Sequence, residues 1–270
     1  MKILLNKNDL NEALYKASNL GFVPTMGSLH KGHISLIKRS LNECTKTIVS
    51  IFINPTQFND KNDYKKYPRN HKKDLSILKK LKVNFVYLPT VNEIYLHKRI
   101  SKIRLNKKDK ILCAKHRKGH FEGVIDVMDR LTKLIKPKKI YMGEKDLQQL
   151  YLVKKFLKKK HNSKIIQCKT IRDRNKLALS SRNLLLNKRN FVKASKLIQD
   201  LIQLKKKLNK KNNISKILLI KKKELSRMYK FKIEYLELRN INNFKLSIKL
   251  KNSKLFIAFY SGKIRLIDNI

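Results

Sequence analysis

The most informative stretch of the chain is Gly21-Phe-Val-Pro-Thr-Met-Gly-Ser-Leu-His-Lys-Gly-His33. An apolar segment leads into a tight Pro-Thr-Met-Gly turn, and two histidines separated by Lys-Gly follow. The apolar residues of segment 34–41 then recur with helical spacing. The pattern predicts a strand that passes through a turn into a helix, with His30 at the junction and His33 in the first helical turn.

The start of a helix is a favourable place for phosphate. Its first backbone N–H groups have no partner within the helix, and the helix dipole is positive at this end. A histidine adds a side-chain donor that can follow charge on a phosphoryl oxygen. The segment therefore favours a site for a nucleotide polyphosphate. The alternative is two ordinary histidines at a helix start, because one short motif is only a hypothesis.

The composition is strongly basic. The 270 residues carry a net charge of +47, from 66 Lys plus Arg against 19 Asp plus Glu. Such a charge would suit a nucleic-acid-binding protein, because lysine and arginine neutralise phosphates. The lysines are spread along the chain, however, rather than gathered on one face with interleaved aromatics. Lys, Asn and Ile share A/T-rich codons, so we attribute the charge to drift in base composition and expect no specific nucleic-acid partner.

Length and cysteine content indicate the cellular setting. The length is enough for a substantial core and two domains. No apolar run reaches the length of a membrane span, and the polar residues after segment 1–5 argue against a signal peptide. Cys44, Cys113 and Cys168 are odd in number and widely spaced, which favours reduced thiols without zinc or disulfides. We expect a cytoplasmic protein without a membrane partner.

Strand-like and helix-like segments alternate over the first part of the chain. Residues 46–53 are apolar on both faces, as in a parallel sheet covered by helices. This alternation predicts a doubly wound, Rossmann-like α/β domain with ligands at the carboxyl ends of the strands. We expect strands at residues 21–24, 46–53, 83–88, 139–142 and 164–168, and helices at residues 9–18, 32–41, 70–81, 124–135 and 147–159.

The pattern changes at about residue 170. Two longer helical stretches precede three strand-like segments, an order that predicts a smaller α+β domain. We therefore expect two domains, at residues 1–170 and 171–270. The expected helices of the second domain are residues 187–208 and 214–229, and its expected strands are residues 232–239, 255–260 and 263–267.

Polar residues follow two of the expected strands. Asn54 and Gln57 come after the second strand and carry amide donors and acceptors. After the fourth strand, Gly143 permits a close approach, Lys145 supplies a cation for phosphate and Gln149 could face the same cleft. Because parallel strands end at one edge of a sheet, these groups are expected near the two histidines.

Two further segments carry chemistry of the same kind. Residues 117–121, Arg-Lys-Gly-His-Phe, precede an expected helix. Ser180, Ser181 and Arg182 follow the domain change and offer hydroxyl and guanidinium donors to anionic oxygens. Any one of these segments is more often an ordinary turn or cap. Their occurrence together with the turn that carries His30 and His33, called the histidine turn below, indicates one ligand site.

A set of longer motifs runs along the whole chain. They are Pro24-Thr-Met-Gly-Ser-Leu-His-Lys-Gly-His33, Val49-Ser-Ile-Phe-Ile-Asn-Pro-Thr-Gln-Phe58, Tyr67-Pro-Arg69, Gly119-His-Phe-Glu-Gly-Val124, Gly143-Glu-Lys-Asp-Leu-Gln-Gln149, Leu177-Ala-Leu-Ser-Ser-Arg-Asn183 and Arg265-Leu-Ile-Asp-Asn269. In this order and spacing they resemble the pantothenate synthetase (pantoate–β-alanine ligase) family. The combination is very specific, whereas His30-x-Gly-His33 alone would fit the wider superfamily of nucleotidylyltransferases and class I synthetases.

The resemblance implies an ATP-dependent ligase that condenses pantoate with β-alanine through a pantoyl-adenylate intermediate. A carboxylate is a poor electrophile towards an amine, because an oxide would have to leave. Transfer of AMP to the carboxylate solves this problem, with release of pyrophosphate, and the amine then displaces AMP to give pantothenate. Charge builds on phosphate oxygens in the first step, so fixed donors and cations lower its barrier.

The resemblance also implies roles for individual residues. The catalytic group comprises His33, His30, Lys145, Ser180, Ser181 and Arg182. Gln57, Gln149 and Asn54 are expected at the pantoate and β-alanine positions. The residues expected to bind ATP are Met26, Gly27, Ser28, Leu29, His30, Lys31, Gly32, His33, Gly143, Glu144, Lys145, Asp146, Ile171, Leu179, Ser180, Ser181 and Arg182. Mg²⁺ is expected with ATP, held largely by phosphates and water without a protein metal cage, and a homodimer is expected.

The chain departs from the family pattern at three places. The family usually has Arg-Pro-Gly-His where this chain has Arg117-Lys-Gly-His120, and its upstream Glu falls on Cys113. Its usual Asp-Gly pair falls on Asn175 and Lys176. Without Pro and Gly these loops are less constrained, and Lys176 would resist a left-handed turn. We expect effects on efficiency and stability rather than on the reaction.

Two other function classes stay open at this point. Another adenylate-forming or nucleotidylyl-transferring enzyme of the superfamily would share the histidine turn but need not keep Gln57 and Gln149. A non-enzymatic nucleic-acid-binding protein is favoured by the charge alone. Tight, salt-sensitive RNA binding with a dispensable His33 would indicate the second class.

The net charge of +47 predicts a salt-dependent stability. Like charges repel one another most at low ionic strength, and added salt screens this repulsion. We expect the Tm in differential scanning calorimetry to rise clearly from low to moderate NaCl. A Tm that stays flat over this range would show that self-repulsion does not limit the stability.

Overall fold

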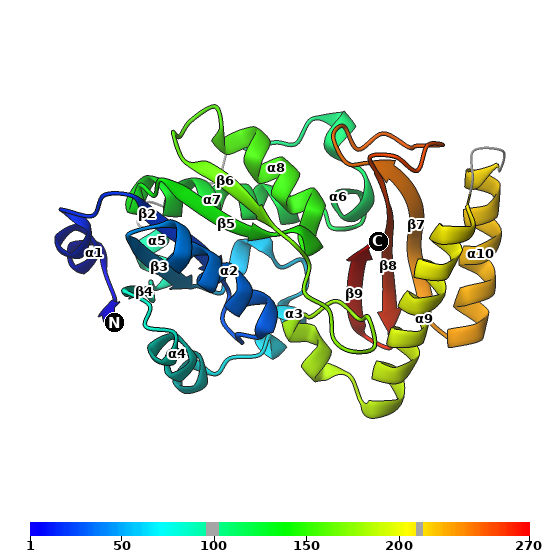
Figure 1. Cartoon of the computed structure of the whole chain (residues 1–270), viewed down its shortest axis with the longest axis horizontal. Helices are drawn as coiled ribbons and strands as arrows, with labels where there is room; N and C mark the ends of the chain where they lie inside the picture. The colour runs from blue at the N-terminus through cyan, green and yellow to red at the C-terminus, as the bar shows by residue number, and fades with distance from the viewer. Residues whose placement is uncertain (96–102, 209–212) are drawn as a thin grey trace. The chain divides into compact units, whose positions relative to one another are not determined.

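The computed structural model describes residues 1–95, 103–208 and 213–270. They form two compact units, Met1–Lys169 and Thr170–Ile270. The first unit holds a six-stranded sheet and the second a three-stranded sheet (Figure 1). Within the described residues, no helix is long and apolar enough to cross a membrane.

The sheet of the first unit is parallel throughout. Fully buried side chains lie on both of its faces, Val23 and Val49 on one and Phe22 and Ile48 on the other. The strand order is β1-β4-β3-β2-β5-β6. This is the doubly wound α/β fold that the alternation of segments predicts. The strands are β1 Lys2–Leu4, β2 Leu20–Thr25, β3 Lys46–Ile51, β4 Phe85–Tyr87, β5 Lys139–Gly143 and β6 Lys164–Cys168.

Helices bury the apolar faces of this sheet. On one face, Ile37 of α2 and Leu78 of α4 join Val23 and Val49 in one apolar cluster. Gly21 allows α2 to lie close to β2, because a Cβ there would be 2.2 Å from Ser40 Oγ. The helices of the unit are α1 Lys7–Leu14, α2 Lys31–Glu43, α3 Lys61–Lys66, α4 His71–Lys80, α5 Val91–Ile94, α6 Leu112–His116, α7 His120–Ile135 and α8 Leu147–Leu157.

The direction in which the chain winds changes between β2 and β5. From β2 the sheet continues through β3 and β4 on one side and through β5 and β6 on the other. Parallel strands end at the same edge, so the segments that follow β2, β3 and β5 leave the sheet side by side. Loops that diverge at such a switch point leave room for a ligand. These segments contain residues 26–33, 54–57 and 143–149.

The sequence predicts the main elements correctly but misses the edge strand β1. Only Leu4 of this strand is buried, so the segment has no clear pattern, and its strand form depends on pairing with β4. Several ends also differ. The helix expected at residues 9–18 begins at Lys7, because the Asn6 side chain caps it by accepting the Asp9 N–H. The short helices α3, α5 and α6 were not predicted.

The second unit is a smaller α+β unit, as the sequence predicts. Leu197 and Ile198 of the first helix pack with Leu255 and Ile257 of the central strand in one apolar core. The three strands are antiparallel in the order β7-β8-β9. The elements are α9 Lys188–Lys207, α10 Ile214–Tyr229, β7 Lys232–Asn240, β8 Ser253–Ser261 and β9 Ile264–Asn269.

A tight turn near the start of the second unit contains a strained lysine. Arg172 and Ala178 form an antiparallel bridge. The Lys176 N–H closes the turn between them by donating to the Asp173 carbonyl at 3.1 Å. Lys176 has a φ of +71°. This is the left-handed region, which a lysine was expected to resist. For a residue with a side chain this conformation costs about 1 kcal/mol.

Replacing Lys176 by glycine should therefore stabilise the second unit. The lysine is exposed, so the change relieves strain without removing packing. We expect Lys176→Gly to raise the free energy of unfolding by about 0.5 to 1 kcal/mol, because the greater freedom of glycine in the unfolded chain offsets part of the gain. Urea denaturation followed by circular dichroism measures this. The control is Lys176→Ala, which removes the same side chain but keeps a Cβ; an equal gain from both variants would contradict the strain.

Candidate active site

The turn after β2 has an unusual backbone. Gly27 has a φ of +77° and Ser28 a φ of +52°, so two consecutive residues are left-handed. Position 27 also requires glycine for space, since a Cβ there would be 2.9 Å from Asp74 Oδ2 and 3.0 Å from Ile51 Cγ2. The chain then enters α2, with His30 as the residue that caps the helix.

The buried carboxylate of Asp74 holds this turn. Its Oδ2 accepts the Ser28 N–H at 2.8 Å and its Oδ1 accepts the Leu29 N–H at 2.8 Å. The Gly27 N–H donates to Thr25 Oγ1 at 3.2 Å. Asp74 is not among the residues predicted from the sequence. The available signal was a charged residue four positions before Leu78, on the buried face of an amphipathic helix, since both residues are buried in α4.

His30 and His33 complete the start of α2 with their own rings. His30 Nδ1 accepts the Gly32 N–H at 3.1 Å, and His33 Nδ1 accepts the His30 N–H at 3.4 Å. The ring centroids are 4.1 Å apart. A neutral imidazole whose Nδ1 accepts carries its proton on Nε2. Both rings are therefore Nε2–H donors.

These contacts bear on one prediction from the sequence. The backbone N–H groups at the helix start were expected to form the seat for phosphate. In the turn before α2 and in the first helical turn, the N–H groups of Ser28, Leu29, His30 and Gly32 are bound within the protein, to Asp74 and the two rings. The imidazole Nε2–H groups add two side-chain donors to those of the backbone.

The surroundings keep both histidines uncharged. Burial lowers the pKa of His33 to about 3, and the charges of His30 and Lys145 act in the same direction. Burial and the charge of Lys145 lower the pKa of His30 to about 4, against an opposing effect of Asp146. The influence of Lys145 on both rings means that its ammonium group lies near them.

Lys145 comes from the connection that follows β5. Residues 144–146 form a short 3₁₀ turn that leads directly into α8. The Lys145 ammonium lies 3.9 Å from Asp146 Oδ1. At Gly143, a Cβ would meet nothing within 4 Å, so this glycine faces open space rather than tight packing. Gln149 follows in the first turn of α8 and is partly exposed.

Asn54 and Gln57 form a third group, after β3. Asn54 Oδ1 accepts from Tyr95 Oη at 2.8 Å, and its amide donates to the Gly123 carbonyl at 3.1 Å and to Gln57 Oε1 at 3.4 Å. The Gln57 amide contacts Met26 Sδ, which joins this group to the turn after β2. Both residues are buried, so their amides are fixed in place.

Arg117 and His120 support the same group. Arg117 donates to His120 Nε2 at 2.8 Å, so the proton of this ring lies on Nδ1. The Nδ1–H donates to the Gln57 carbonyl at 2.6 Å. Lys118, which replaces the usual proline, is exposed, and Gly119 has a φ of +81°. The departure at Lys118 therefore leaves the Arg117–His120 pair intact.

The remaining predicted residues lie in the second unit. The Leu179 N–H donates to the Ile171 carbonyl at 3.0 Å, beside the strained Lys176 turn. Ser180 caps a short 3₁₀ helix by accepting the Arg182 N–H at 3.3 Å, and Ser181 is buried. The structure thus brings these predicted residues together within their own unit.

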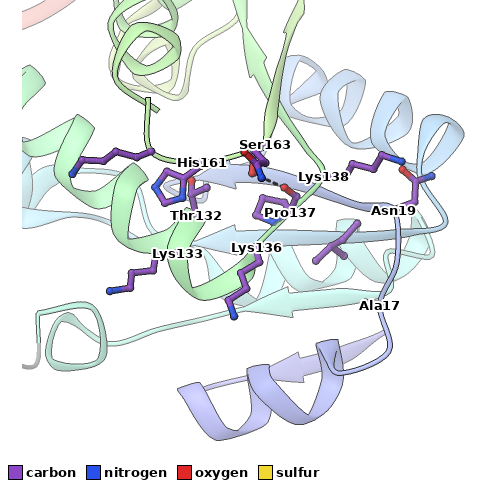
Figure 2. A pocket seen from close by; sticks show the side chains of 12 residues that line it. Ala17, Asn19, Thr132, Lys133, Lys136, Pro137, Lys138, His161 and Ser163 are labelled. Atoms are coloured by element: carbon purple, nitrogen blue, oxygen red, sulfur yellow. Dashed lines mark hydrogen bonds between the residues drawn. The ribbon is translucent and has the colours of Figure 1, made fainter. Parts of the chain in front are cut away.

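Figure 2 shows a pocket of about 460 Å³ at the other edge of the parallel sheet. Leu20 at the start of β2, Lys138 before β5 and Ser163 before β6 line it, so it lies at the amino ends of these strands. None of the residues predicted to bind ATP or pantoate is among its lining. Lys133 and Lys136 lie at the end of α7, where lysines complement the helix dipole. The pocket is not the candidate active site.

The chain matches one family of known proteins over its length. The sequence profile of the family described as Pantoate-beta-alanine ligase matches residues 2–270. The chain belongs to this family. A pantothenate synthetase from Azobacteroides pseudotrichonymphae genomovar. CFP2 is 40% identical over 282 residues, which cover 100% of this chain and 99% of that protein.

Solved structures of ligases of this family have the same fold. The pantothenate synthetase of Thermus thermophilus is 30% identical, with a TM-score of 0.93 over 100% of this chain and 99% of that one. The ligase of Francisella tularensis, complexed with beta-gamma ATP and beta-alanine, is 36% identical, with a TM-score of 0.86 over 100% and 97%. The predicted fold class and family are confirmed, and the enzyme is a ligase that joins pantoate to β-alanine.

The lowered pKa values predict that both rings of the ligase's histidine turn stay neutral in mild acid. A histidine in a peptide protonates near pH 6.5. Because burial lowers the pKa of His30 to about 4 and of His33 to about 3, we expect their ring ¹⁵N shifts to stay constant from neutral pH to about pH 5. His30→Asn and His33→Asn variants assign the signals. A titration midpoint near pH 6.5 for either ring would contradict the burial of these side chains.

Proposed function

We propose that this ligase activates the pantoate carboxylate with ATP at the switch point between β2 and β5. One observation carries the proposal: two neutral imidazole donors and the ammonium of Lys145 gather where the connections after β2 and β5 leave the sheet. This is where open parallel sheets bind ligands. A relative from Francisella tularensis is complexed with an ATP analogue and β-alanine, which supports ATP as the activating substrate.

The chemistry proceeds in two steps. A carboxylate oxygen of pantoate bonds to the α-phosphorus, the bond to the bridging oxygen breaks, and pyrophosphate leaves with its electron pair. The amine of β-alanine then attacks the carbonyl carbon of the mixed anhydride. AMP leaves and the amine loses a proton, so that pantothenate, AMP and pyrophosphate are formed.

His33, His30 and Lys145 would act on the phosphates. The hydrogen bond from an Nε2–H donor becomes stronger as the phosphate oxygen gains negative charge. The neutral imidazole already carries this proton, so it exchanges none with solvent before it donates. A fixed ammonium adds full positive charge where pyrophosphate departs. We infer that His33 stabilises the transferring phosphate, with His30 and Lys145 beside it. The turn residues Met26 to Gly32 and the residues Gly143 to Asp146 would surround ATP.

Asn54, Gln57 and Gln149 would bind pantoate, and Gln57 would also contact β-alanine. The amides of Asn54 and Gln57 are fixed by hydrogen bonds to Tyr95 and to the Gly123 carbonyl, and by the contact with Met26. Fixed amides suit hydroxyl and carboxylate groups, because they offer donors and acceptors without reorganising. Through its contact with Met26, Gln57 also links the amides proposed to bind pantoate to the histidine turn.

For Ile171, Leu179, Ser180, Ser181 and Arg182, the assignment to ATP rests on their resemblance to the family motif. Their hydroxyl and guanidinium groups are donors suited to phosphate oxygens. Mg²⁺ would come with ATP, held largely by the phosphates and water. Bound to the phosphates, it would neutralise their charge. We also propose a homodimer in the cytoplasm.

The proposed role of His33 predicts a large loss of activity in His33→Ala. Removing one fixed donor to developing charge costs about 2 to 4 kcal/mol, a factor of about 10² to 10³ in kcat. Pantoate-dependent formation of AMP from ATP in the presence of β-alanine measures it. His71→Ala is a matched control, because His71 is an exposed histidine of the same unit and should keep full activity.

Isotope exchange of pyrophosphate into ATP tests the order of steps. Exchange that needs pantoate but not β-alanine would support pantoyl adenylate. Exchange that proceeds without pantoate would contradict the assignment and favour another adenylating enzyme. Full activity of a folded His33→Ala variant would contradict the role of the histidine turn.

A further inference from the structure

The buried residues of α4 are Asp74 and Leu78, and the Asp74 carboxylate reaches the histidine turn. Asp74 is 1% exposed. Each carboxylate oxygen accepts a separate backbone N–H, from Ser28 and from Leu29, both at 2.8 Å. Asp74 lies in the first turn of α4, where the positive end of the helix dipole favours a carboxylate.

The carboxylate compensates for an unfavourable backbone. Ser28 has a φ of +52° directly after Gly27 at +77°. A left-handed serine costs about 1 kcal/mol, and such strain persists only where the surroundings hold it. Two hydrogen bonds to a charged acceptor provide that support, since such bonds are worth about 1.5 to 3 kcal/mol each.

The shape of this turn decides where the two imidazoles point. His30 follows Leu29 directly and caps α2 through its Nδ1. The His30 N–H in turn fixes His33 Nδ1. A change in the turn at Ser28 and Leu29 would therefore move the His30 backbone and both Nε2–H donors.

The same contacts decide which groups an anion can use. Asp74 occupies two N–H groups that would otherwise form an anion-binding concavity, as consecutive left-handed residues often do.

We propose that Asp74 is a positioning residue for ATP, which holds the turn at Gly27 to Leu29 so that His30 and His33 present their Nε2–H groups to the phosphates. The proposal rests on the proposed role of the histidine turn. Asp74 acts through the backbone and does not touch the substrate. The competing explanation is a structural one, in which Asp74 only fastens α4 to the turn and contributes stability.

The test is Asp74→Asn in the full-length enzyme. The amide has nearly the same shape, but it offers one acceptor oxygen, and its NH₂ group faces the other N–H. We expect kcat/KM for ATP to fall about 10- to 100-fold, the factor for one lost bond to a charged acceptor. KM for pantoate should change less, because Asn54 keeps its bonds to Tyr95 and to the Gly123 carbonyl.

The matched control is Asp129→Asn. Like Asp74, Asp129 accepts two hydrogen bonds in the first unit, but from side chains: His161 at 2.7 Å and Lys160 at 3.1 Å. His161 and Lys160 line the pocket at the opposite edge of the sheet. Asp129→Asn should lower the free energy of unfolding without lowering kcat/KM for ATP. The ring ¹⁵N shifts of His30 and His33 provide a second readout, and they should move in Asp74→Asn but not in Asp129→Asn.

If Asp74→Asn does not fold, Gly27→Ala answers the same question with the carboxylate intact. Its Cβ would lie 2.9 Å from Asp74 Oδ2 and push the turn off its acceptor, so the same loss for ATP is expected. A folded Asp74→Asn enzyme with lower stability but unchanged kcat/KM for ATP and unchanged ring shifts would overturn the proposal. If Asp74→Asn and His33→Ala were both fully active, the proposed role of the whole histidine turn would be rejected. If His33→Ala lost activity strongly while Asp74→Asn kept it, only the role of Asp74 would be rejected.

Discussion

The change of winding direction between β2 and β5 is the constraint on which the site depends. Because the strands are parallel and adjacent, the turn after β2 and the connection after β5 leave the sheet at the same edge. Chain that continues towards β3 on one side and β6 on the other cannot close over this point. Residues more than a hundred positions apart in the sequence, His30 and Lys145, therefore influence one another electrostatically.

The two histidines of the candidate site carry none of the chain's large positive charge. The chain as a whole carries +47, yet the two histidines nearest the candidate phosphate position are neutral, because burial and Lys145 disfavour their protonation. The Asp74 carboxylate, which reaches the turn, is occupied by backbone N–H groups. The groups proposed to meet an anion are a pair of polarised N–H donors beside the ammonium group of Lys145. Such a set responds to charge that develops during a reaction more than to charge that is already present.

The departures from the family pattern have different structural consequences. Lys118 is exposed and leaves the Arg117–His120 pair in place. Cys113 is buried in the short helix α6, where a thiol behaves as a small apolar side chain. Lys176 is forced into a left-handed turn. Of the three, only the Lys176 departure carries a clear conformational cost, and that cost falls on stability within the second unit.

Sequence alone was enough to predict the fold class and the family and to propose which segments carry the site, because strand and helix periodicity and ordered motifs are local properties of the chain. The prediction that residues 21–41 form a strand, a turn and a helix needed no distant residue. Only the tertiary structure decided how that turn works. Asp74 lies 46 positions from Ser28, and its helix looks ordinary in the sequence. The edge strand β1 and the lowered pKa values of the two rings likewise depend on neighbours that only folding brings close, so no local pattern could encode them.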